Sequence, residues 1–81
     1  MAKIRRRNLP LPLLNHLIER IDQRHISTEQ LALLADWLMA EPEVPNGPWF
    51  KRFPAMIVCG DGELVKTFLL PNQTPVGEEA R

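Results

Sequence analysis

Residues 27–40 read STEQLALLADWLMA, and this stretch predicts the helix around which the rest of the chain is organised. Ser27 is suited to cap the N-terminus of such a helix. Gln30 stands three residues later, where its side chain can return a hydrogen bond and complete a capping box. Pro42 disfavours helical geometry in the residue before it, so we expect the helix to end near residue 40 or 41.

The apolar residues of this helix cover more of its circumference than one neighbouring element can bury. One stripe suited to the core is formed by Leu31, Leu34, Ala35 and Leu38. Leu33 and Trp37 lie outside that stripe, on the face that also carries Glu29 and Asp36. We therefore expect another segment of this chain, or a second chain, to cover Leu33 and Trp37.

An amphipathic pattern predicts an earlier helix from Leu13 to about Arg24. Its apolar side is a continuous stripe of Leu13, Leu14, Leu17, Ile18 and Ile21. The connection between the two helices is very short and consists of His25 and Ile26. The helices must therefore either turn sharply or pack as an antiparallel hairpin.

Two strand-like runs follow the helices, AMIVC at residues 55–59 and ELVKTFLL at residues 63–70. The residues between them are Gly60, Asp61 and Gly62, and Asp-Gly is a favoured turn of β-hairpins. The sequence therefore predicts an α+β fold, with a helical hairpin followed by a β-hairpin, in a single small domain of 81 residues.

The remaining segments lack a helix or hairpin pattern. Residues 41–54 contain four prolines and an Asn-Gly pair, which predicts an ordered loop whose aromatic residues cover the helices. Residues 1–9 form a basic arm whose order the sequence leaves open. We expect residues 71–81 to be a loosely ordered tail.

The distribution of charge and the cysteine content indicate the kind of environment in which the protein acts. Ten basic and ten acidic residues give zero net charge, yet no acidic residue precedes Glu19. Cys59 is the only cysteine, so no internal disulfide can form, and a lone thiol suits a reducing compartment. No stretch approaches the length needed to span a membrane, and the N-terminal region makes a poor signal peptide. We expect a cytoplasmic protein.

The sequence gives weak support for an enzyme. An active site needs a nucleophile or a metal, a base, and a group that binds developing charge. There is no glycine-rich phosphate loop between a strand and a helix, and no pair of histidines has metal-ligand spacing. The residues therefore favour a non-enzymatic protein without catalytic residues, cofactor or metal.

Two basic segments are candidates for nucleic-acid binding, and their cations are Lys3, Arg5, Arg7, Lys51 and Arg52. The last two lie in WFKRF at residues 49–53, where aromatic rings could stack on bases while the cations contact phosphates. The commoner structural interpretation is that these rings cover the helices and the cations point to solvent. We favour that interpretation.

Residues 3–38 contain, in order, a short basic segment, a Leu-Pro pair, a first helix, a capping serine and an apolar second helix. The matching residues are Lys3-Ile4-Arg5-Arg6-Arg7, Leu9-Pro10, Leu13 and Leu17, Ser27, and then Leu31, Ala35 and Leu38. This order resembles ribbon-helix-helix DNA-binding regulators, in which two chains pair their strands and one strand face enters the major groove. The resemblance implies that Lys3, Arg5 and Arg7 lie on that face.

A second alternative function is suggested by the order of the predicted elements, in which the helices precede the strands. Phe50-Lys51-Arg52-Phe53 leads into the predicted hairpin. This arrangement is similar to small ribonuclease toxins of the RelE type, which carry basic residues on their sheet. The resemblance implies RNA cleavage.

Our leading interpretation is a small non-enzymatic binding or regulatory protein that acts through protein–protein contacts. It rests on the excess of apolar surface over what one short domain can cover. The candidate interface residues are Leu33, Trp37, Trp49 and Phe50. We expect a homodimer or another protein partner to cover them, with nucleic acid as an alternative partner of the basic arm.

Overall fold

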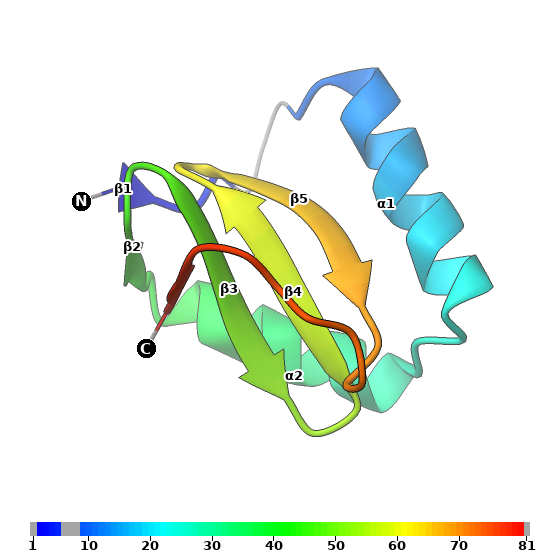
Figure 1. Ribbon diagram of the computed structural model, residues 1–81. Helices are drawn as coiled ribbons and strands as arrows, with labels where there is room; N and C mark the ends of the chain where they lie inside the picture. Colours follow the sequence, from blue (N-terminus) through cyan, green and yellow to red (C-terminus); the bar gives the residue numbers. More distant parts are fainter. Residues whose placement is uncertain (1, 6–8, 81) are drawn as a thin grey trace.

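The computed structural model describes residues 2–5 and 9–80, which form two helices and six strands (Figure 1). The helices are α1 (Leu11–Gln23) and α2 (Thr28–Met39), and the strands are β1 (Ala2–Lys3), β2 (Glu43–Val44), β3 (Pro48–Phe53), β4 (Met56–Asp61), β5 (Leu64–Leu69) and β6 (Glu78–Glu79). Four strands form a mixed sheet in the order β5-β4-β3-β6, and β1 pairs separately with β2. The predicted single small α+β domain is confirmed.

Helix α2 begins as its sequence predicts, with Ser27 as the N-cap residue. The backbone N–H of Gln30 donates to Ser27 Oγ over 3.3 Å, which satisfies one of the free donors of the first turn. Gln30 Oε1 accepts a hydrogen bond from Ala55 N–H at 3.0 Å. The side-chain oxygen that was predicted to accept from Ser27 in a capping box thus ties the start of α2 to the turn between β3 and β4.

The two helices turn sharply and pack against different strands. Helix α1 lies against β5, whereas α2 lies against β3. Figure 1 shows α2 crossing behind the sheet and α1 diverging from it beyond β5. His25 makes the turn with a φ of 51°, a left-handed conformation that is uncommon outside glycine. Since each helix covers its own part of the sheet, the space between them is open.

The prediction of a loop over residues 41–54 is wrong for residues 48–53, which form β3. This strand pairs along its whole length with β4, from Pro48 opposite Asp61 to Phe53 opposite Met56. The proline that favoured a loop is the first residue of the strand, a position that tolerates the loss of an N–H donor. Antiparallel pairing with β4, which follows after only Pro54 and Ala55, therefore outweighs the local turn signals.

The predicted β-hairpin is confirmed as β4 and β5, which pair antiparallel with a register shift between Cys59 and Gly60. Gly60 is required there because a Cβ at this position would collide with the ring of Trp49. That ring is fully buried, and its Nε1–H donates to Gly62 O at 2.9 Å. The hairpin bend and the buried tryptophan thus hold each other in place.

The main core lies between the helices and one face of the sheet. Its buried side chains include Leu17, Leu34, Val44, Trp49, Met56, Val58, Val65 and Phe68. Ile57 is only 1% exposed but does not belong to this cluster, because successive side chains of a strand point to opposite faces.

The opposite face of the sheet is crossed by the segment that follows β5. In Figure 1 this segment passes in front of β4 and β3 and ends in β6, a strand that the sequence did not predict. Strand β6 runs parallel to β3, and Ala80 N–H donates to Phe50 O at 2.6 Å. The end of the predicted tail, Glu78–Glu79, therefore joins the sheet, whereas residues 71–77 form no strand.

Candidate functional site

The aromatic residues of α2 and β3 contact one another inside the chain. The ring of Trp37 lies 5.8 Å from that of Trp49 and 6.1 Å from that of Phe53, measured between centroids. Both pairs have the tilted or edge-on geometry that aromatic rings prefer. A segment of the same chain thus covers one side of Trp37, as one of the two sequence expectations proposed, and Trp49 lies in the core.

Two other predicted interface residues remain partly accessible. Leu33 lies on α2 with 41% of its surface exposed. Phe50 lies on the opposite face of the sheet, half-buried, with the Arg52 guanidinium 5.3 Å from its ring centroid. Leu33 and Phe50 therefore lie on different sides of the molecule and do not form one surface with Trp37 and Trp49.

The cations of the WFKRF segment also separate. Strand alternation places Lys51 on the helix-covered face and Arg52 on the other. Lys51 Nζ lies 5.8 Å from the ring centroid of Trp37, and Arg52 stacks on Phe50. Each cation is thus held by an aromatic ring of its own face. Trp49, Lys51 and Phe53 thus share the helix-covered face, where Trp49 is buried, and Phe50 and Arg52 share the other face.

The N-terminal cations make contacts within the chain where the structure describes them. Lys3 Nζ donates to Glu41 O at 2.8 Å, and Arg5 Nη1 lies 3.6 Å from Glu63 Oε1. Strand β1 pairs with β2 through Ala2 and Lys3. Arg7, the third cation of the predicted strand face, lies outside the described residues.

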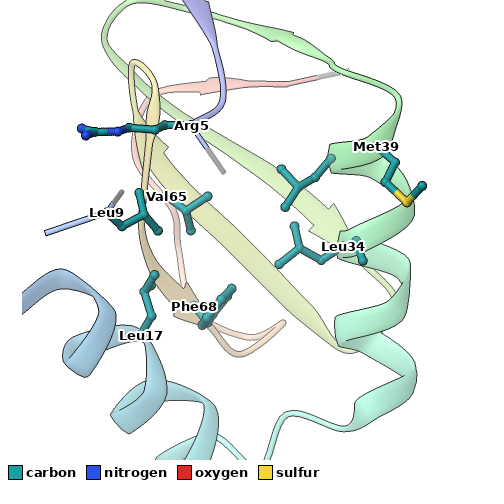
Figure 2. A pocket seen from close by; sticks show the side chains of 9 residues that line it. Arg5, Leu9, Leu17, Leu34, Met39, Val65 and Phe68 are labelled. Carbon is teal, nitrogen blue, oxygen red and sulfur yellow. The ribbon is translucent and has the colours of Figure 1, made fainter. Parts of the chain in front are cut away.

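The divergence of the helices leaves an open apolar cavity of about 310 Å³ between them. Figure 2 shows Leu17, Val65 and Phe68 facing Leu34 across this space. The full lining is Arg5, Leu9, Leu17, Leu34, Ala35, Leu38, Met39, Val65 and Phe68. Among these described residues, Arg5 is the charged one. The sequence pattern assigns Leu34, Ala35 and Leu38 to the core but gives no sign of the cavity, because it depends on the angle between two helices.

A second apolar feature lies on the outer side of α1. Leu11, Leu14 and Ile18 are 67%, 37% and 63% exposed, and their spacing places them on one line along the helix. The core stripe predicted for this helix therefore divides. Leu13, Leu17 and Ile21 pack inward, whereas Leu14 and Ile18 face solvent. The width of the predicted stripe was the only sequence signal of this outer face.

The described part of the chain contains no group of three or more histidine, cysteine or acidic side chains that could hold a metal ion. Burial raises the pKa of the Cys59 thiol above its ordinary value, which disfavours the nucleophilic thiolate at neutral pH. Neither α1 nor α2 is long and apolar enough to cross a membrane.

Comparison of the chain with protein-family models, with curated proteins and with solved structures found no match.

Proposed function

We propose that this chain is a small non-enzymatic binding protein that acts through protein–protein contacts, and that its contact surface is the outer face of α1. We define this face as Leu11, Leu14 and Ile18. The partner that we propose is a second copy of the chain, which presents the same face. The lone, half-buried thiol of Cys59 suits a reducing compartment, and we place the dimer in the cytoplasm.

The exposed line of apolar side chains on α1 is the observation that carries this proposal. Single exposed apolar residues are ordinary on protein surfaces, but an aligned set marks an interaction site. Residues at positions i, i+3 and i+7 are the usual anchors of a helix that packs into an apolar contact. Burial of this surface requires an apolar face on the partner. The outer face of α1 in a second copy of the chain is such a face.

Charge along α1 favours an antiparallel arrangement of the two helices. The first turn of α1 contains no acidic residue, whereas Asp22 is exposed in its last turns. Across a two-fold axis, Asp22 of one protomer lies near the N-terminus of α1 of its partner. The helix dipole favours a negative charge at that end. Two-fold contacts of this kind use the same patch on both subunits and close without forming filaments.

In the two alternative functions, DNA binding and RNA cleavage, basic side chains would contact the nucleic acid. A ribbon-helix-helix regulator would need β1 to pair with a second chain through the edge that β2 does not occupy. A RelE-like toxin would need Lys51 and Arg52 to act together, although they lie on opposite sheet faces. Fluorescence anisotropy with duplex DNA at two salt concentrations tests the first alternative, and growth arrest on expression tests the second.

Sedimentation equilibrium at micromolar concentrations tests the proposed dimer. We expect the protein to sediment as a dimer and Ile18→Glu to sediment as a folded monomer. The substitution introduces a charge into the apolar contact but removes little from the monomer core, because Ile18 is largely exposed. Circular dichroism would show whether the variant keeps its helices.

Gln23→Glu is the matched control, because it adds the same charge to the same helix at an exposed position outside the contact face. This variant should remain dimeric. A monomeric parent protein, or a dimer that Ile18→Glu leaves intact, would rule out the proposed surface.

A further inference from the structure

We propose that the cavity between α1 and α2 binds a single-chain amphiphile, whose unbranched hydrocarbon chain lies in the cavity and whose carboxylate meets Arg5. This ligand site is separate from the outer face of α1 and does not depend on dimer formation. The cavity volume, about 310 Å³, falls at the lower end of the range for small-molecule pockets.

The chemistry of the lining selects an apolar occupant. Eight of the nine lining residues are apolar, and they come from the N-terminal segment, both helices and β5. Water in this open cavity would find one polar side chain, Arg5, among the described lining residues. A hydrocarbon chain would instead replace water along Leu17, Leu34 and Phe68. The lining therefore favours an alkyl chain over a sugar, a nucleotide or a peptide backbone.

The charge at the cavity selects an anionic headgroup. Arg5 lines the cavity, and none of the other described lining residues carries a charge. Its ion pair with Glu63 spans 3.6 Å between two side chains that are both exposed, and such pairs are weak. A guanidinium carries five N–H donors, so it can bind a second carboxylate while it keeps its existing contacts. A cationic headgroup would find no acidic lining residue.

The cavity can also accommodate chains of different length. Met39 lies at the end of α2 and lines the cavity while 73% of its surface is exposed. Figure 2 shows its side chain directed away from Leu34, out of the centre of the cavity. Methionine is unbranched and flexible, so its thioether can move to cover the end of a longer ligand.

Isothermal titration calorimetry with free carboxylates below their micelle-forming concentrations tests this site. We expect saturable one-to-one binding whose affinity rises roughly fourfold for each added methylene, from hexanoate to octanoate to decanoate. Octan-1-ol has the same chain length as octanoate without its charge and should bind more weakly. An affinity that does not depend on chain length would overturn the proposal.

Two variants locate the ligand. Ala35→Trp should abolish binding because the indole would occupy the cavity, whereas Ala32→Trp adds the same ring at an exposed position of α2 outside the lining. Arg5→Gln should weaken octanoate binding and leave octan-1-ol binding unchanged. Lys66→Gln removes an exposed cation of β5 and serves as its control. Equal binding by Ala35→Trp and the parent protein would refute the assignment.

Anionic lipid vesicles distinguish a free carboxylate from a lipid surface as the source of the headgroup. The proposal predicts that the parent protein binds free decanoate in the absence of vesicles, and that Ala35→Trp does not. Association with vesicles alone, without binding of free carboxylates, would contradict it.

Discussion

Trp37 of α2 and Trp49 of β3 lie with their ring centroids 5.8 Å apart and their planes inclined by 59°. Phe53 meets the ring of Trp37 edge-on, at 79°. These contacts join the helix that the local sequence predicts most clearly to a strand whose local sequence suggests a loop. The aromatic cluster thus supplies the tertiary contact that fixes β3 against α2.

Replacement of Trp37 tests how much this cluster stabilises the fold. Removal of a buried tryptophan side chain typically costs 3–5 kcal/mol. Because Trp37 is only half-buried, we expect Trp37→Ala to lower the free energy of unfolding by about 3 kcal/mol, at the lower end of that range. Urea denaturation measures the change. Leu33→Ala on the exposed side of α2 should cost much less, and equal losses for the two variants would contradict this account.

Gly77 is expected to be irreplaceable in the segment that crosses the sheet. Its φ is 96°, and a Cβ there would collide with the carbonyl oxygen of Pro48. We expect Gly77→Ala to destabilise the protein by about 1–3 kcal/mol, because it combines backbone strain with a steric clash. Gly47→Ala is the control, since its added Cβ would have no atom within 4 Å. Thermal unfolding of both variants would show the difference, and similar melting temperatures would argue against the close approach.

We expect Gln30 to stabilise the contact between α2 and the turn that joins β3 and β4, in addition to helix α2 itself. Its Oε1 accepts from Ala55 N–H in the turn between β3 and β4. Gln30→Met keeps the length of the side chain and removes this acceptor, so we expect a loss of about 0.5–1.5 kcal/mol, typical of one hydrogen bond. Amide hydrogen exchange should accelerate at Ala55 in this variant. Unchanged protection of that amide would show that the bond contributes little.

The thiol of Cys59 should respond to pH in a defined direction. Burial raises its pKa in the folded protein, so the unfolded chain loses the thiol proton at a lower pH than the folded chain does. The contribution of Cys59 to stability is therefore fully present below the unfolded pKa and is lost as the pH rises through the folded pKa. We expect urea midpoints to fall over that alkaline range more in the parent protein than in Cys59→Ser. Alkylation of Cys59 by iodoacetamide should likewise be slower in the folded protein than in urea.

The features that the sequence predicted correctly depend on neighbouring residues. Ser27 caps α2, and β4 and β5 form the predicted hairpin, although Gly60 and Asp61, which were predicted between the strands, lie in β4. Residues 48–53 show the opposite case. Pro48 and the prolines and glycine that flank this stretch suggest a loop, yet residues 48–53 pair with β4 along six positions.

The candidate surfaces were harder to predict than the elements. The apolar stripe of α1 was correctly placed on one side of the helix, but periodicity alone does not say that Leu17 turns inward while Ile18 stays exposed. That division is decided by the position of β5 relative to the helix. Lys51 and Arg52 separated for a simpler reason, since a strand sends adjacent side chains to opposite faces.

The sequence by itself determined the two helices, the start of α2 and the hairpin of β4 and β5, because capping, periodicity and turn preferences act over a few residues. Tertiary structure alone decided that β3 and β6 join the sheet, that Trp37 packs on Trp49, and that a cavity opens between α1 and α2. Strand β6 and the contact between Trp37 and Trp49 depend on residues far apart in the sequence, and the cavity depends on the angle between the helices. A short window of sequence contains no information on either.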